Sequence, residues 1–272
     1  VERLAAVAGV ARVGDLHDLP ADAVRAAQVA LAAENRRGMT FVPVVDGLVI
    51  DRPPIDAVAD GSAAGIPTIV GTNLDEVRLF AAADPHLAGL DEVSLRRRAS
   101  ATLGAGAGEV LEVYRRERAR RGETSTPADL WLAVESDRVF RVPAVRLADA
   151  QVPHAPTHLY LFAYASPGLD GWLGACHVLE VPFVFGHQGR PDIAWFTGVG
   201  DRADALAAGM GAAWSSFAAS GVPSLPGGTT WPRYDTEARP TLVWDVPPRV
   251  EAAPRDEERR VLARWSGTSL GM

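Results

Sequence analysis

The side chain best suited to acid–base chemistry is His177, in the stretch from Gly174 to Gly186. This stretch follows a strand-like run, Thr157 to Ala163, and leads into a strongly apolar segment. An imidazole takes up and releases protons near neutral pH, so a histidine in such a turn can act as a general base. A lone histidine in an apolar stretch is more often a hydrogen-bonded core residue, however, so an acidic partner is needed to favour chemistry.

A matching acidic position lies upstream. Residues Pro67 to Val70 predict a short buried strand, and the loop after it ends in Asp75 and Glu76, which open a helix. Two strand ends thus deliver an acid and then a base. In an α/β-hydrolase the nucleophile comes first in the chain, the acid second and the histidine last. The acid and the histidine of this sequence follow the second half of that order. Spacing alone does not decide whether Asp75 or Glu76 is the acid.

Both stretches resemble the type-B carboxylesterase and cholinesterase family. Gly71 to Val77 is similar to the family's Gly-x-Asn-x-Asp-Glu-Gly motif, and Gly174 to Gly186 is similar to its Gly-x-x-His-x-x-Glu-x-x-Phe-Val-Phe-Gly motif. Val77 departs from the pattern, since the family has a small residue after the acid, and its β-branched side chain is expected to crowd the turn. Other segments similar to family landmarks are Phe41 to Gly47, Glu135 to Pro143, Trp214 to Ala218, Gly221 to Pro223 and Trp231-Pro232.

The resemblance implies a Ser-His-Glu catalytic triad in which Glu76 is the acid and His177 the base. It implies that Asp75 and Glu180 support this pair without taking part in the reaction, and that the buried charge of Glu180 stabilises the loop that carries His177. It also implies the fold, an α/β protein that forms the C-terminal half of an α/β-hydrolase and contains the later strands of its central sheet.

A serine esterase also needs a nucleophile on a tight strand-to-helix elbow and backbone N–H donors for the oxyanion. The family's Gly-Glu-Ser-Ala-Gly and Gly-Gly motifs precede the acid, and neither occurs there in this sequence. Gly267 to Gly271 fits Gly-x-Ser-x-Gly, but no strand precedes it and no room for a helix follows it. We therefore expect the serine and the oxyanion hole upstream of this chain, and we expect the chain alone to be inactive.

Other side chains in the His177 loop allow different chemistry. Cys176 adjoins His177, but neighbours in sequence tend to point apart, which disfavours a cysteine nucleophile. His177, Glu180 and His187 match no common zinc spacing. Neither a metal nor another cofactor is therefore expected.

Two aromatic residues are candidates for binding an ester substrate. Trp172 and Phe185 flank the His177 loop and either line an acyl or alcohol pocket or belong to the ordinary core. The alternative to an esterase is a non-catalytic α/β-hydrolase-like interaction module, since the chain has no nucleophile of its own.

The elements that must position these residues are mostly helices. Phe41 to Val45 and Leu48 to Ile50 predict two strands around an Asp46-Gly47 hairpin turn, and Thr157 to Ala163 predicts the last parallel strand. Helices are expected at about 1–35, 76–83, 91–102, 108–121, 127–150, 201–220 and 254–265.

The domain organisation follows from these elements. No linker composition divides the chain, so residues 1–272 are expected to form one partial α/β-hydrolase domain. The block between acid and base is too long for a simple strand connection, so residues from about 84 to 150 are expected to form a helical, cap-like insertion beside the site.

Composition restricts the partners. A net charge of −7 disfavours nucleic acid, and no apolar run approaches a membrane span. The arginine clusters at 96–98 and 115–121 are expected to be solvated helix faces. One cysteine excludes an intrachain disulfide, so nothing in the sequence requires an oxidising compartment. The location is unknown from the sequence, with a cytoplasmic one favoured. Expected partners are a small-molecule ester and either the missing N-terminal half or a second copy, bound through an exposed sheet edge.

Overall fold

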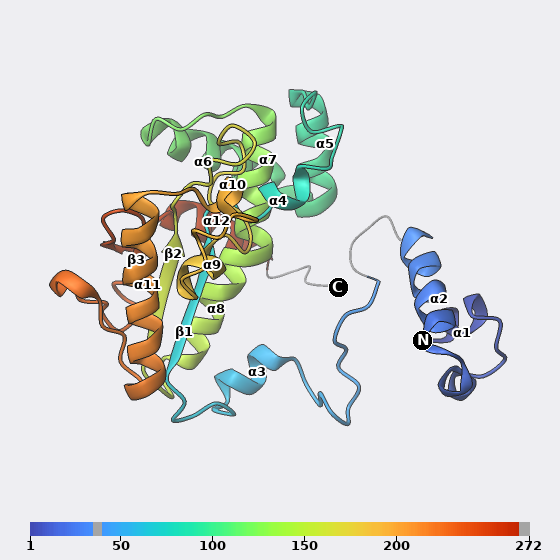
Figure 1. Ribbon diagram of the computed structural model, residues 1–272. Coiled ribbons are helices and arrows are strands. Elements are labelled where there is room, and N and C mark those ends of the chain that lie inside the picture. The colour runs from blue at the N-terminus through green and yellow to red at the C-terminus, as the bar shows by residue number, and fades with distance from the viewer. Residues whose placement is uncertain (35–39, 267–272) are drawn as a thin grey trace. The chain divides into compact units, whose positions relative to one another are not determined.

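The computed structural model describes residues 1–34 and 40–266. The chain divides into two compact units, Val1–Pro53 and Pro54–Met272, whose elements are labelled in Figure 1. One partial domain over residues 1–272 stays a prediction. Within the described residues no helix combines the length and the apolar character that a membrane span requires.

The first unit is helical, as predicted for its N-terminal part. Its helices are α1 (Glu2–Val7), η1 (Val13–Asp18) and α2 (Ala21–Glu34). Ala27 and Leu31 of α2 pack against Leu4 of α1. Val29 of the same helix is 65% exposed, because it lies two residues from Ala27 and so on another side of the helix.

The predicted hairpin around Asp46-Gly47 is wrong, because the described residues on either side form no strands. The Asp46 carboxylate instead accepts hydrogen bonds from the N–H groups of Leu48, Val49 and Ile50. A short polar side chain that bonds the following backbone competes with a strand ladder, and an isolated two-stranded hairpin is only marginally stable.

The second unit contains a four-stranded sheet in the order β1-β2-β3-β4. Its strands are β1 (Thr68–Asn73), β2 (Thr157–Phe162), β3 (Pro240–Trp244) and β4 (Arg249–Ala252). The first three are parallel, and β4 is antiparallel to β3. The prediction that the strand at Thr157 is the last parallel strand is therefore wrong, because β3 follows it and is parallel to it. The parallel pairing of β3 with β2 could not be predicted from the sequence, because β3 is short and is joined to β4 by a tight turn.

The helices of the second unit are α3 (Pro54–Ala59), α4 (Arg78–Ala81), α5 (Glu92–Leu103), η2 (Gly104–Gly106), α6 (Ala107–Arg120), α7 (Pro127–Ser136), the π-helix η3 (Asp137–Arg141), α8 (Val142–Gln151), α9 (Glu180–Val184), α10 (Ala194–Thr197), α11 (Asp201–Ser220), η4 (Pro226–Gly228) and α12 (Asp256–Ser266). The predicted helices of this unit are present to within a few residues, whereas the short helices α3, α9, α10 and η4 were not predicted. One predicted helix, at 127–150, is thus α7 and α8 joined by a π-helix.

Helices cover both faces of the sheet (Figure 1). Val145 of α8 packs with Val70 and Leu159, whereas Met210 of α11 packs with Leu242. Successive strand residues point to opposite faces. The two helices therefore enclose the sheet, and the loops that carry the predicted site leave the ends of β1 and β2.

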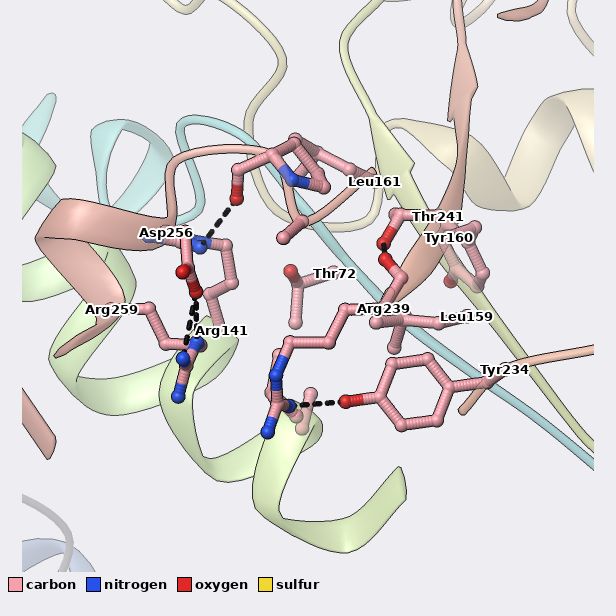
Figure 2. Close-up of a pocket in the computed structure, with 15 residues that line it drawn as sticks. Thr72, Arg141, Leu159, Tyr160, Leu161, Tyr234, Arg239, Thr241, Asp256 and Arg259 are labelled. Atoms are coloured by element: carbon pink, nitrogen blue, oxygen red, sulfur yellow. Dashed lines mark hydrogen bonds and ion pairs between the residues drawn. The ribbon is translucent and has the colours of Figure 1, made fainter. Parts of the chain in front are cut away.

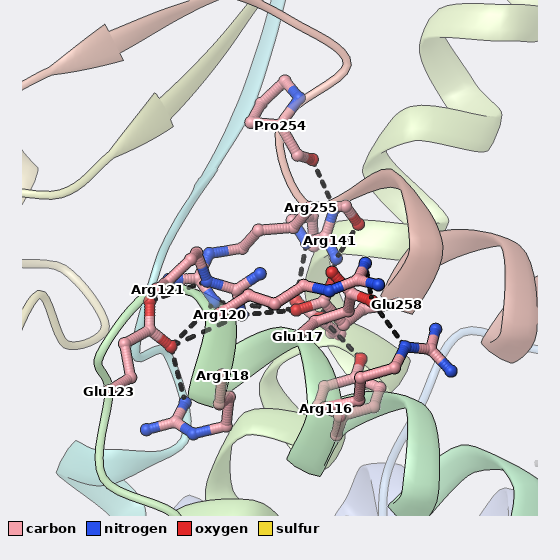
Figure 3. A network of polar contacts seen from close by, with 12 residues as sticks. Arg116, Glu117, Arg118, Arg120, Arg121, Glu123, Arg141, Pro254, Arg255 and Glu258 are labelled. Carbon is pink, nitrogen blue, oxygen red and sulfur yellow. Dashed lines mark hydrogen bonds and ion pairs between the residues drawn. The ribbon is translucent and has the colours of Figure 1, made fainter.

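The expectation that the arginines at 115–121 form a solvated face is wrong for Arg118, whereas Arg121, just after α6, is exposed (Figure 3). Arg118 is 8% exposed and pairs with Glu123 at 3.3 Å. Arg121 pairs with Glu258 of α12 at 2.5 Å. The partner on α12 lies far away in sequence, so a local charge pattern could not predict the pairing.

Candidate active site

Glu76 and His177 lie in contact. His177 Nδ1 and Glu76 Oε2 are 2.6 Å apart, although 101 positions separate the residues. The strands β1 and β2 are adjacent and parallel, so the loops after their C-terminal ends meet at the same side of the sheet. The sheet thus brings together the two side chains that the sequence singled out.

Glu76 is a buried carboxylate held from two sides. Its side chain is 6% exposed, its Oε1 accepts the N–H of Asn73 at 2.8 Å, and its Oε2 faces His177. Burial raises the pKa of Glu76 above its ordinary value, although the Asn73 N–H and the imidazole both favour the ionised form. A carboxylate placed in this way can orient an imidazole and stabilise its protonated form.

His177 is accessible on the side away from Glu76. Its side chain is 35% exposed, and within the described part of the chain no residue bonds its Nε2. The bond at Nδ1 favours the tautomer that carries the proton there, which leaves Nε2 as a free acceptor. The next residue, Val178, has a φ of +60°, which is strained for a β-branched side chain. Such strain is typical of a turn built around a functional group.

A set of hydrogen bonds joins the acid loop to the His177 loop. Ala175 N–H donates to Asp75 Oδ2 at 3.0 Å, and Asp75 N–H donates to the Ala175 carbonyl at 2.9 Å. The amide of Asn73 donates to the Cys176 carbonyl at 2.7 Å and to Glu180 Oε2 at 2.5 Å. Asp75 and Glu180, the two supporting acids implied by the resemblance, therefore both lie in the contact between the loops.

Gly174 is required at this contact. Its φ is +56°, and a Cβ at this position would come within 2.4 Å of Asp75 Oδ2. Only glycine leaves room for the carboxylate and adopts this φ without strain.

Two aromatic residues that sequence reasoning did not single out lie against the imidazole. The ring centroids of Phe80 and Phe140 are 5.1 and 5.2 Å from that of His177. Phe80 lies four residues after Glu76 in a segment predicted to be helical. Side chains at this spacing are neighbours on a helix, so the spacing could have indicated that Phe80 lies near the site. Phe140 lies in the π-helix η3, and no local pattern connects it with His177. Together they place apolar rings beside the imidazole.

The two predicted pocket residues lie at different places. The Trp172 ring lies under the guanidinium of Arg78, with its centroid 5.6 Å from Cζ, and it lines a hollow with Leu87 and Leu169. Phe185 is 68% exposed and lies beside His187. Their role in binding a substrate stays a prediction.

The other sequence features resolve as follows. Cys176 is fully buried, and burial raises the pKa of its thiol to about 12, so it stays protonated and is a poor nucleophile.

Val77 adopts a helical conformation and donates its N–H to Ser136 Oγ at 3.1 Å, so the turn accommodates it. Among the described residues no group of three or more His, Cys, Asp or Glu could hold a metal ion. Gly267 to Gly271 lies outside the described residues.

A second hollow lies on the α8 face of the sheet, and neither Glu76 nor His177 lines it (Figure 2). Arg259 pairs with Asp256 at 2.7 Å, and Arg239 bonds the hydroxyl of Tyr234. These cations are already paired, which makes the hollow a poor anion site.

Known proteins resemble this chain over most of its length. The sequence profile of the Carboxylesterase family matches residues 11–262. The para-nitrobenzyl esterase of Bacillus subtilis (strain 168) is 32% identical over 84% of this chain and 44% of its own length. The phenmedipham hydrolase of Pseudarthrobacter oxydans is 27% identical over 75% of this chain and 40% of its own length.

Solved structures agree with these relatives. The carboxylesterase EST55 of Geobacillus stearothermophilus superposes with a TM-score of 0.78 at 35% identity, over 96% of this chain and 53% of its own. Such carboxylesterases have the α/β-hydrolase fold, so the predicted fold class is confirmed. The chain spans about half the length of the proteins it matches, and it belongs to the carboxylesterase family.

Proposed function

We propose that this chain supplies the acid and the base of a serine carboxylesterase, with Glu76 as the acid and His177 as the base. The observation that carries the proposal is the 2.6 Å contact between His177 Nδ1 and Glu76 Oε2. A buried carboxylate at Nδ1 fixes the ring and directs Nε2 toward the accessible side. This is the geometry that a general base in a catalytic triad needs.

The chemistry follows from this arrangement. In the complete enzyme the serine and the oxyanion donors lie upstream of this chain. His177 Nε2 takes the serine proton as the hydroxyl oxygen attacks the ester carbonyl carbon, and it returns the proton to the oxygen of the leaving alcohol. A water then hydrolyses the acyl-serine, again with His177 as base. Glu76 accepts the Nδ1–H throughout and stabilises the imidazolium, while Asp75 and Glu180 hold the two loops together.

The substrates are carboxylic esters. Phe80 and Phe140 offer an apolar surface beside His177, where an acyl or alkoxy group of the ester can pack. Trp172 and Phe185 are further walls of this binding region. The helical block from about 84 to 150 carries Phe140 and forms the cap-like part of the site.

The partner that completes the enzyme binds at the β1 edge of the sheet. Among the described residues β1 pairs only with β2, so one side of its backbone is open to another strand. The missing N-terminal half would pair there, and a second copy of the chain would do so in its absence.

An esterase assay tests the proposal on the protein that combines this chain with its upstream sequence, which should contain a Gly-x-Ser-x-Gly elbow. The wild type is expected to hydrolyse a p-nitrophenyl ester, and His177→Ala should reduce kcat by about 10⁴-fold or more, because the base is lost. His187→Ala, which removes an exposed histidine that follows α9, is the control and should retain activity. An absent elbow together with no hydrolysis would favour the non-catalytic interaction module.

A further inference from the structure

Arg78 connects the acid loop to two other segments of the chain. It is the first residue of α4, two positions after Glu76, and its side chain is only 15% exposed. An arginine buried to this extent needs partners for its charge and for its donors.

Each part of the guanidinium has a partner. Nε lies 3.2 Å from Asp75 Oδ1 and Nη2 lies 3.1 Å from Asp129 Oδ1 on α7. Nη1 donates to the Trp172 carbonyl at 2.9 Å, and the indole of the same residue lies against the guanidinium. One side chain thus joins the acid loop, α7 and the segment that leads into the His177 loop.

The Asp75 carboxylate continues this connection. Its Oδ1 faces Arg78, while its Oδ2 accepts the N–H of Ala175, two residues before His177. Asp129 anchors the other side of the guanidinium to α7. Burial opposes its ionisation, but hydrogen bonds from Thr126 and Thr124 and the charge of Arg78 hold the pKa of Asp129 below its ordinary value. The guanidinium therefore lies between two carboxylates that would repel each other without it.

We propose that Arg78 is a positioning residue that sets the contact between Glu76 and His177. It fixes the segment 172–175 against the acid loop and so holds the imidazole at its 2.6 Å separation from Glu76. The planar fork reaches three partners in different directions, which a lysine ammonium on a flexible stem cannot do. The catalytic consequence of this contact depends on the proposed esterase function, whereas the structural claim does not.

The structural claim can be tested on this chain by proton NMR. A histidine Nδ1 proton bonded to a carboxylate gives a resonance far downfield, which reports directly on the Glu76–His177 contact. Arg78→Gln should shift this resonance upfield or broaden it beyond detection, and Arg78→Lys should recover it in part. An unchanged resonance in a folded Arg78→Gln would overturn the proposal.

Arg239→Gln is the matched control. The Arg239 side chain is 17% exposed, pairs with Asp149 at 2.8 Å and lies over the ring of Tyr234, but it does not touch either loop of the site. Its loss should lower the melting temperature without moving the His177 resonance. An equal shift in this control would show a merely structural effect and would also overturn the proposal.

Two further measurements keep the test decisive. If Arg78→Gln does not fold, Asp129→Asn removes one anchor of Arg78 and should shift the resonance in the same direction by a smaller amount; no shift would contradict the proposal. In the complete esterase, Arg78→Gln should lower kcat about 10- to 100-fold with little change in KM, because a displaced base slows chemistry more than binding. A wild type without esterase activity would refute the proposed function but leave the NMR result on Arg78 intact.

Discussion

The Glu76 carboxylate is costly to the fold at neutral pH. Burial raises its pKa although two hydrogen bonds favour the charged form, so the folded chain holds its proton more tightly than the unfolded chain does. A buried ionisable group with a shifted pKa that lowers stability is typical of a functional residue.

A pH prediction follows for Glu76→Gln. As pH rises from the ordinary carboxyl pKa to the raised one, the unfolded wild type loses this proton first, and stability falls. The glutamine variant lacks this loss. Its free energy of unfolding, measured by urea denaturation at several pH values, should therefore improve relative to wild type across the acidic range. A constant difference, or one that moves the other way, would show that burial does not govern this carboxyl.

The thiol of Cys176 should be unreactive in the folded chain. It is buried, and its raised pKa of about 12 keeps it protonated at pH 8. A disulfide reagent should label it only slowly under native conditions and completely in denaturant. Rapid stoichiometric labelling of the native chain would support the cysteine nucleophile that the sequence disfavours.

At the scale of elements, the contact between the acid loop and the His177 loop depends on Gly174. Gly174→Ala introduces a Cβ that meets Asp75 Oδ2, so either the Asp75 side chain or the loop must shift. Gly171→Ala is the control, because that residue also has a positive φ, +81°, but no atom lies within 4 Å of its added Cβ.

Both glycine variants should lose roughly 1–2 kcal/mol of stability from the positive φ alone. Gly174→Ala should lose clearly more and should also weaken the Asp75–Ala175 bonds. Urea denaturation measures the difference between the two variants. Equal losses would mean that Asp75 moves aside freely and does not fix the loop.

Local sequence signals predicted most elements of the second unit but not their pairing. Hydrophobic periodicity predicted helices such as α6 and α11, because this signal is local in sequence. The parallel pairing of β3 with β2 and the burial of Arg118 come from segments that approach only in the folded chain. The Asp46 turn replaced a hairpin because one carboxylate captured three backbone N–H groups.

For the site, too, the sequence predicted the residues that lie in local motifs but not those that only the fold brings near. The motifs around Glu76 and His177 are local in sequence, and they singled out two side chains that lie 2.6 Å apart in the fold. Phe140 was not found, because it reaches His177 only through the π-helix between α7 and α8. Arg78 was missed because its three partners lie in separate segments.

At the scale of the whole molecule, β1 is one of the two edge strands of the sheet among the described residues, and β4 is the other. The open backbone groups of β1 should drive concentration-dependent association of the isolated chain. Size-exclusion chromatography with light scattering should show species larger than a monomer as concentration rises. A clean monomer at high concentration would contradict this expectation.

The account depends most on Glu76 and His177 acting as one unit. The direct test measures kcat for a p-nitrophenyl ester in the complete esterase with Glu76→Gln, His177→Ala and both changes together. Members of a catalytic unit are strongly non-additive. The double variant should therefore be no slower than His177→Ala alone, which should lose about 10⁴-fold or more, while Glu76→Gln should lose about 10³-fold or more. Losses that multiply, or a single variant with wild-type kcat, would contradict the assignment of this pair.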